Sequence, residues 1–187
     1  MVHMNSNYRQ LASTEQINSQ IDRVAAEIIA DFPTDSPLFV ALLRGAAPFA
    51  SQLMTSIVRQ RPDYHPELDY MMVRTYGDER SAGQPQIITD VAPGTVIAGR
   101  DVIILDDVLD KGITAHSVAS HLSNKGAAST KLAVLCAKST ERTHDISTDY
   151  SCFEFADNWL VGMGMDDAKA ANEGYRWLQE IWEIKQS

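Results

Sequence analysis

The sequence has few cysteines, few basic residues and no long apolar segment, and each shortage excludes a class of protein. Two cysteines, Cys136 and Cys152, lie in strand-like runs without metal-ligand spacing, so we expect core thiols rather than a disulfide framework. Only 16 Lys and Arg stand against 25 Asp and Glu, and the net charge of −9 argues against a nucleic-acid partner. No apolar run approaches the roughly 18 residues of a membrane helix, and the first residues contain no apolar signal core. We therefore expect a cytoplasmic protein without a membrane partner.

The two common glycine-rich nucleotide-binding loops are also missing from the chain. No G-x-x-x-x-G-K-S/T segment is present, which excludes a Walker-type phosphate loop. No G-x-G-x-x-G follows a predicted strand, which argues against a Rossmann dinucleotide site. The five histidines share no metal-binding spacing, and we assign them no chemistry.

Apolar strands that alternate with amphipathic helices predict one α/β domain over residues 1–187. Ser13 and Gln16 can form a capping box, after which apolar residues recur at helical spacing as far as Ala30. Pro48 stands in the first turn of a second predicted helix, which extends to Gln60. The predicted strands occupy residues 38–43, 68–74, 87–96, 102–105, 131–137, 150–155 and 159–163. We expect these strands to form a mostly parallel sheet.

The segment from Val102 to Thr114, VIILDDVLDKGIT, contains the most informative pattern in the chain. Its first four residues are apolar and branched, which predicts a strand that is buried on both faces of a parallel sheet. Asp106 and Asp107 follow at the carboxyl end of that strand, where such sheets bind ligands. Gly112 permits the backbone to turn, and Thr114 would open a helix whose first amides attract an anion. The pattern indicates a site for a phosphorylated sugar, although an acidic turn after a core strand would also explain it.

Residues 106–114, DDVLDKGIT, resemble the phosphoribosyl pyrophosphate (PRPP) signature of type I phosphoribosyltransferases. Other segments narrow the resemblance to the hypoxanthine-guanine phosphoribosyltransferases, and the likeness covers roughly residues 38–184. It implies an α/β fold with a mostly parallel central sheet flanked by helices, and a small hood region built from terminal segments. It also implies a homodimer or a homotetramer.

The resemblance implies a role for each polar residue of the signature. Asp106 and Asp107 would bind the ribose hydroxyls and a Mg²⁺ ion, and Asp110 would be the general base or acid at N7 of a purine. The loop that follows would hold the 5-phosphate, mostly through backbone amides. Its residues are Lys111, Gly112, Ile113 and Thr114. Lys111 and Ile113 depart from the residues that the family commonly has around this glycine.

Segments outside the signature resemble the pyrophosphate and metal sites of the same family. Arg44 and Gly45 match a Leu-Lys-Gly element that has a non-proline cis peptide and helps to bind pyrophosphate, although an ordinary strand-to-helix turn would also explain them. Asp166 matches a Mg²⁺ ligand. Arg176 matches a pyrophosphate-binding arginine, but the connection before it, residues 167–171, is lengthened and has an aspartate in place of the usual tyrosine.

Lys138, Trp159 and Leu160 resemble the purine site of the family. Lys138 would donate to the exocyclic oxygen of a 6-oxopurine, Trp159 would stack on the ring, and Leu160 would offer backbone hydrogen bonds to its edge. Without the resemblance, a solvated lysine and a core tryptophan would be the simpler interpretations. Thr75 and Tyr76 match a Ser-Tyr pair on a flexible loop, which implies a lid, and a solvated connection is the alternative.

The resemblance implies Mg²⁺-dependent transfer of a 5-phosphoribosyl group from PRPP to N9 of hypoxanthine or guanine. The products would be IMP or GMP and pyrophosphate, in purine salvage. Two alternatives stay open: a transferase that prefers xanthine or another base, and a regulatory member of the fold that binds RNA and senses nucleotides. The acidic balance of the chain and the purine-site residues Lys138 and Trp159 count against the second alternative.

Overall fold

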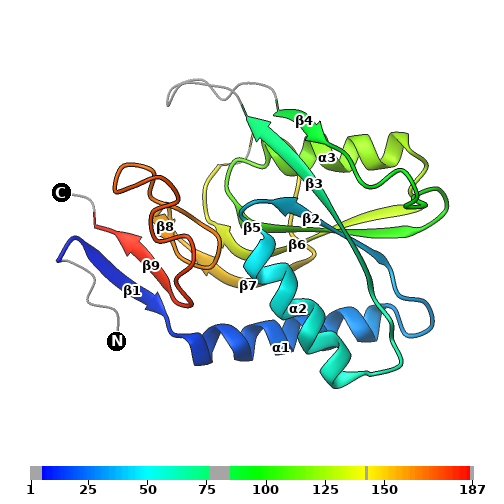
Figure 1. Ribbon diagram of the computed structural model, residues 1–187, viewed down its shortest axis with the longest axis horizontal. Coiled ribbons are helices and arrows are strands. Elements are labelled where there is room, and N and C mark those ends of the chain that lie inside the picture. Colours follow the sequence, from blue (N-terminus) through cyan, green and yellow to red (C-terminus); the bar gives the residue numbers. More distant parts are fainter. Residues whose placement is uncertain (1–5, 76–84, 142, 186–187) are drawn as a thin grey trace.

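A computed structural model describes residues 6–75, 85–141 and 143–185, which form two sheets and three helices (Figure 1). The main sheet has six strands in the order β4-β3-β2-β5-β6-β7, and a smaller sheet has the order β1-β9-β8. The elements are β1 (Tyr8–Ala12), α1 (Thr14–Asp31), β2 (Leu38–Leu43), α2 (Ala47–Gln60), β3 (Glu67–Thr75), β4 (Pro85–Thr89), β5 (Asp101–Leu109), α3 (Ile113–Asn124), β6 (Ser129–Lys138), β7 (Tyr150–Phe155), β8 (Trp159–Val161) and β9 (Ile181–Ile184). Among the described residues, no helix is both long enough and apolar enough to cross a membrane.

The helix predicted from Ser13 is α1, and its capping box forms as expected. The Ser13 side chain accepts a hydrogen bond from the Gln16 amide, and the Gln16 side chain accepts one from the Ser13 amide. The apolar residues at helical spacing, among them Ile17, Val24 and Ile28, are fully buried. Local sequence therefore determines both where this helix starts and which face it packs against the sheet.

The central strands of the main sheet are apolar on both faces because helices cover both sides (Figure 1). Phe39 and Leu105 pack on the side of α1 and α2, whereas Val40 and Ile104 pack on the side of α3. Strands β3, β2, β5, β6 and β7 run parallel, and only β4 is antiparallel to its neighbour. The predicted mostly parallel sheet flanked by helices is thus confirmed.

After each of the two central strands, β2 and β5, the chain continues toward a different edge of the sheet. From β2 the chain passes through α2 to β3 on one side, and from β5 it passes through α3 to β6 on the other. Two crossovers of the same hand that leave in opposite directions put α2 and α3 on opposite faces, so neither of these two helices crosses the carboxyl ends of β2 and β5. This is the switch point at which open α/β sheets bind ligands.

The smaller sheet, here called the hood, joins the two ends of the chain and confirms the region predicted from terminal segments. Strand β1 pairs antiparallel with β9, with Tyr8 opposite Ile184, and β9 pairs antiparallel with β8, with Trp159 opposite Ile184. Neither β1 nor β9 was predicted as a strand. Each is only 5 or 4 residues long, and the partner of β1 lies at the far end of the chain.

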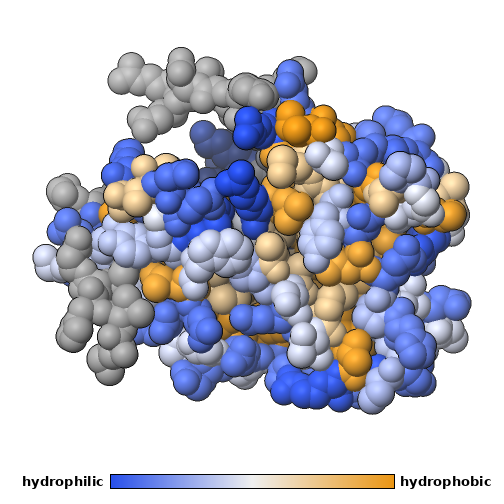
Figure 2. Space-filling view, viewed as in Figure 1, coloured by the Kyte–Doolittle hydropathy of each residue, from blue (hydrophilic) through white to orange (hydrophobic). Residues whose placement is uncertain are grey.

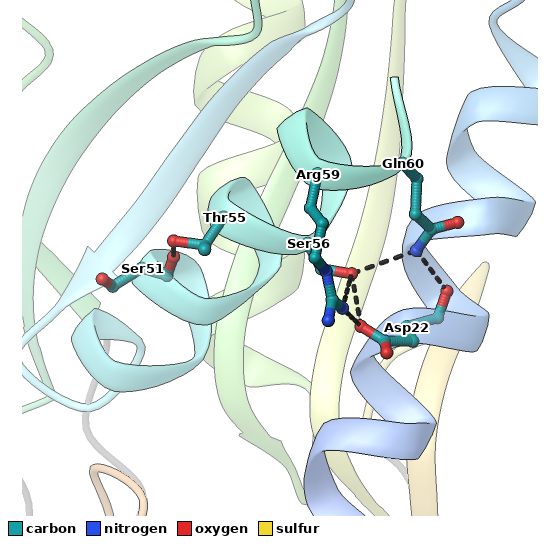
Figure 3. Close-up of polar contacts among 6 residues, drawn as sticks. All are labelled: Asp22, Ser51, Thr55, Ser56, Arg59 and Gln60. Atoms are coloured by element: carbon teal, nitrogen blue, oxygen red, sulfur yellow. Dashed lines mark hydrogen bonds and ion pairs between the residues drawn. The ribbon is translucent and has the colours of Figure 1, made fainter. Parts of the chain in front are cut away.

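A polar cluster ties α1 to α2 on their shared side of the sheet (Figure 3). The Asp22 carboxylate accepts hydrogen bonds from the buried Ser56 hydroxyl, at 2.6 Å, and from the Arg59 guanidinium. Gln60 donates from its side chain both to the Asp22 carbonyl, at 2.9 Å, and to the Ser56 hydroxyl, at 3.0 Å. One carboxylate therefore satisfies a buried hydroxyl and a cation from the neighbouring helix.

Replacing Asp22 with alanine should lower the free energy of unfolding by about 1 to 3 kcal/mol, because a buried hydroxyl and a guanidinium lose their shared acceptor. Urea unfolding measures this loss. The control is Glu27→Ala, which removes the exposed ion pair between Glu27 and Arg23 and should cost only about 0.3 to 0.5 kcal/mol. Equal losses in the two variants would show that the cluster does not stabilise the helix pair.

Candidate active site

The site begins where β5 separates from β2. Strand β5 pairs with β2 only as far as Leu105, opposite Ala41, but it stays paired with β6 as far as Leu109, opposite Ala137. The predicted strand over residues 102–105 was therefore too short, because β6 continues to supply hydrogen-bond partners after β2 has turned away. The two aspartates that were expected in a loop lie on the strand itself, beside the gap that β2 leaves.

A pocket of about 480 Å³ occupies this gap. In the space-filling view, a hollow lies between the hood and the main sheet, with hydrophilic residues on its left side and hydrophobic ones on its right (Figure 2). The pocket brings together nine of the residues predicted for the site, from three separate parts of the chain: Gly45, Asp106, Asp107, Asp110, Lys111, Gly112, Ile113, Thr114 and Arg176. It also has an apolar wall made of Leu42, Leu43 and Val73.

Two glycines allow three chain segments to meet at the edge of this pocket. A Cβ atom on Gly45 would lie 2.0 Å from Oδ2 of Asp107, so only glycine lets the turn after β2 approach the carboxylate. A Cβ atom on Gly164 would lie 1.8 Å from the Gly45 carbonyl oxygen, and Gly164 has a φ of +107°. The peptide between Leu43 and Arg44 is cis, as the resemblance implied.

The acidic pair lies in surroundings that disfavour its charge. Burial raises the pKa of Asp106 well above its ordinary value, and the neighbouring charge of Asp107 raises it further. Burial also raises the pKa of Asp107, although hydrogen bonds and the nearby Arg176 guanidinium act in the opposite direction. The Asp107 amide donates to Asp106 at 3.0 Å, and the Val108 amide donates to Asp107 at 2.8 Å. Sugar hydroxyls or a cation placed against the pair would relieve the repulsion between the two carboxylates.

The donor set available for a metal at this pair is small. Within the described ranges, no group of three or more His, Cys, Asp or Glu side chains is arranged to hold a metal ion. Mg²⁺ is commonly held by only one or two carboxylates, with substrate phosphates and water as its other ligands. Asp106 and Asp107 fit that pattern. Asp166 does not line the pocket itself, but its carboxylate lies 2.9 Å from Nη2 of Arg176, which does.

The phosphate loop predicted from the signature turns through Gly112. This residue has a φ of +79° and lies directly before α3, which begins at Ile113 rather than at the predicted Thr114. A Cβ atom at position 112 would lie 2.4 Å from Cγ2 of Ile146, so the loop between β6 and β7 fills the space that a side chain would need. The amides of this loop and the positive end of the α3 dipole therefore meet at the pocket, as an anion requires.

Asp110 is held by hydrogen bonds on both of its carboxylate oxygens. Nζ of Lys138 lies 3.2 Å from Oδ2, and the Thr140 hydroxyl donates to Oδ1 at 3.0 Å. Lys138 is the last residue of β6, its side chain is only 11% exposed, and it also pairs with Asp157 at 3.4 Å. The sequence indicated Lys138 and Asp110 but not Thr140, whose only signal was its position two residues after the lysine.

Arg176 lines the pocket and makes a contact with each of its three nitrogen atoms. Nη2 pairs with Asp166 at 2.9 Å, Nη1 donates to the Gly164 carbonyl, and Nε donates to Glu173. Glu173 also accepts from Arg44, which is exposed and does not line the pocket. The two arginines predicted to bind pyrophosphate are thus joined by a glutamate that the sequence did not indicate.

The connection before Arg176 is anchored by the aspartate that replaces the family's usual tyrosine. Asp167 is buried, and it accepts hydrogen bonds from the Tyr8 hydroxyl at 2.8 Å and from the Lys169 amide at 3.0 Å. Burial and the carboxylate of Asp167 raise the pKa of Tyr8. The lengthened connection is therefore tied to the hood through β1.

None of the predicted purine residues lines the 480 Å³ pocket: Lys138 ends β6 of the main sheet, whereas Trp159 and Leu160 lie on β8 of the hood. Trp159 on β8 is 55% exposed, so it is not the core tryptophan that the simpler interpretation required. The Lys169 amino group lies 5.9 Å from the centre of its ring. The side chain of Leu160 is buried. Of the predicted lid, Thr75 is the last residue of β3, and Tyr76 lies outside the described residues.

The fold and the site together define a class of protein. A parallel sheet that splits beside an acidic pair, with a glycine-turned phosphate loop and an arginine around the same pocket, suits a phosphorylated sugar. In agreement with this, residues 7–168 match the family described as "Phosphoribosyl transferase domain". The chain belongs to the phosphoribosyltransferase family.

Named relatives show to which group within the phosphoribosyltransferase family the chain belongs. The chain is 35% identical over 177 residues to the hypoxanthine-guanine phosphoribosyltransferase of Streptococcus agalactiae, covering 94% of this chain and 92% of that one. It is 34% identical over 176 residues to the enzyme of the same name from Bacillus subtilis. The crystal structure of a hypoxanthine phosphoribosyltransferase from Staphylococcus aureus matches with a TM-score of 0.85 at 29% identity, over 98% of this chain and 97% of that one. Within its family, the chain is a member of the hypoxanthine-guanine phosphoribosyltransferases.

Replacing Gly164 with alanine should cost at least about 2 kcal/mol of folding free energy, because the new methyl group meets the Gly45 carbonyl in a backbone conformation that alanine rarely adopts. Thermal or urea unfolding measures the loss. Gly94→Ala is the matched control, since a Cβ atom there has nothing within 4 Å and its cost should stay within about 0.5 kcal/mol. Two variants of equal stability would contradict the close approach.

The acidic pair predicts a pH-dependent gain in stability for Asp106→Asn. The pKa of Asp106 is about 3.9 in the unfolded chain and is raised in the folded protein. The native protein therefore loses stability as the pH rises from the unfolded-state pKa through the folded-state pKa. Asparagine cannot ionise, so the variant should be more stable than the native protein at pH 7.5 without divalent cations, by about 1.4 kcal/mol for each unit of the shift. The difference should narrow as the pH falls toward about 4. A variant less stable than the native protein at pH 7.5 would contradict this account.

Proposed function

We propose that this protein transfers the 5-phosphoribosyl group of PRPP to N9 of hypoxanthine or guanine, giving IMP or GMP and pyrophosphate in purine salvage. One observation carries the proposal. The acidic pair, the phosphate loop and Arg176 line one pocket at the split between β2 and β5, in a member of the hypoxanthine-guanine phosphoribosyltransferases. Four further pockets among the described residues lack this combination of carboxylates for ribose hydroxyls and a helix N-terminus for a phosphate.

The sugar phosphate occupies the β5 side of the pocket in this proposal. The amides from Lys111 to Thr114 hold the 5-phosphate at the positive end of α3. Asp106 and Asp107 accept hydrogen bonds from the two ribose hydroxyls. Gly45 and Arg176 border the space on the side of β2 and the hood, where they bind the pyrophosphate with Arg44.

The purine occupies the side of the pocket near β6 and the hood. Asp110 accepts or returns the proton at N7, so that electron density reaches N9 as its bond to the ribose forms. Thr140 and Lys138 fix the direction of that carboxylate through its two oxygens. Lys138 also presents a cation to the oxygen at C6, which disfavours a 6-amino group. Trp159 stacks on the ring, and the backbone of Leu160 binds its edge.

Mg²⁺ suits the carboxylates of Asp106 and Asp107, and Asp166 is a further candidate ligand. When bound, the ion neutralises charge on the departing pyrophosphate. The chain contributes two carboxylates whose mutual repulsion a cation relieves. The lid role of Thr75 and Tyr76 stays a prediction, since Tyr76 lies outside the described residues. Self-association, a cytoplasmic location and one domain over residues 1–187 stay predictions.

Asp110→Asn should lower turnover with hypoxanthine or guanine by about 10² to 10⁴-fold, because asparagine cannot exchange a proton with N7. Binding of PRPP should persist, since the acidic pair and the phosphate loop are unchanged. The control is Asp157→Asn, which alters the other carboxylate next to Lys138 but no residue that lines the pocket, and should keep turnover within a few-fold. Unchanged turnover in Asp110→Asn would remove Asp110 from its proposed role.

A panel of bases tests the substrate class itself. Purified protein with Mg²⁺ and PRPP should release pyrophosphate with hypoxanthine or guanine, and much less with adenine. A clear preference for xanthine would keep the mechanism and change the substrate. Absence of release with every base would reject the proposed function.

A further inference from the structure

Glu173 makes a contact that the proposed reaction does not use. Its carboxylate accepts from Nη1 of Arg44 and from Nε of Arg176, the two arginines assigned to pyrophosphate. The side chain is 28% exposed, whereas that of Arg44 is 59% exposed and that of Arg176 is 11% exposed. A single anion of the protein therefore joins an exposed arginine of the turn after β2 to an arginine that lines the pocket.

The backbone around Glu173 is held in an unusual conformation. Glu173 has a φ of +59° and Tyr175 a φ of +61°, a left-handed conformation that residues with side chains seldom adopt. The residue between them is fixed, because the Asp167 amide donates to the Gly174 carbonyl at 2.9 Å and a Cβ atom on Gly174 would lie 2.5 Å from the Asp167 carbonyl. The anchored connection thus presents the carboxylate to both arginines at a conformational cost, as functional segments often do.

The charges of this cluster cancel in the free protein. Arg176 faces two carboxylates, Glu173 and Asp166, and Arg44 faces Glu173. The hydrogen bond from Arg176, with that from Arg44, lowers the pKa of Glu173, so this carboxylate stays ionised at neutral pH. Pyrophosphate that approaches the arginines therefore meets a fixed negative charge, and it must share or displace the contacts that Glu173 makes.

We propose that Glu173 is an internal counter-anion that occupies Arg44 and Arg176 in the free protein and competes with the pyrophosphate group of PRPP. The inference rests on the proposed function, since it assigns these arginines to pyrophosphate. Glu173 is a positioning residue: it touches the binding arginines and sets how tightly PRPP and pyrophosphate bind. Loss of its charge leaves Arg176 in place, because Asp166 and the Gly164 carbonyl still hold the other two nitrogen atoms of the guanidinium.

Calorimetric titration with inorganic pyrophosphate and with PRPP, both with Mg²⁺, tests this role directly. Glu173→Gln should bind both ligands about tenfold more tightly than the native protein, and the gain should shrink in an Arg44→Met background because the freed arginine is then missing. Glu27→Gln removes an equal charge from a remote exposed pair and should leave both affinities unchanged. Glu173→Gly also removes the carboxylate, and it suits the positive φ, so a folding defect in the glutamine variant would not hide the effect.

The outcomes separate this inference from the proposed function. Native protein that neither binds PRPP nor turns over a purine would reject the function. Native protein that is active, with glutamine and glycine variants that bind pyrophosphate no more tightly or more weakly, would overturn the role of Glu173 alone. Weaker binding would mean that Glu173 orders the arginines for the ligand rather than competing with it.

Discussion

The separation of β2 from β5 is the constraint on which the rest of this site depends. Strand β5 loses β2 after Leu105 but keeps β6 as far as Leu109, so its acidic residues stay on a rigid strand while one side of that strand becomes free for a ligand. The turn after β2 can remain close only because Gly45 has no side chain to meet Asp107, and the hood can approach this turn only through Gly164. Pocket, acidic pair and hood are therefore brought together by close approaches at these two glycines.

In the free protein, the charged groups of the site interact with one another. A phosphorylated sugar would relieve the repulsion between the two aspartates and replace the carboxylates that pair with Arg176. Asp106 and Asp107 repel each other in half-buried surroundings, which hydroxyl donors or a cation would correct. Arg176, which lines the same pocket, is occupied by carboxylates of the protein itself. Ligand binding then exchanges contacts within the protein for contacts with the substrate. The affinity depends on the difference between the two sets of contacts and not on the arginines alone.

Much of this could be predicted from the sequence, because the informative patterns are local. The capping box at Ser13, the apolar run before Asp106 and the turn at Gly112 each follow from a few adjacent residues. What could not be predicted depends on distant partners. The extension of β5 to Leu109 requires β6, strands β1 and β9 require each other, and the contacts of Glu173 require a turn more than 120 residues earlier in the chain.

The most direct test of the central claim is a crystal structure of the protein with Mg²⁺, PRPP and an unreactive purine analogue. The account predicts the 5-phosphate on the amides from Lys111 to Thr114, the ribose hydroxyls on Asp106 and Asp107, and the pyrophosphate between Gly45 and Arg176. PRPP bound elsewhere on the protein, or bound in this pocket with its phosphate away from the start of α3, would contradict it.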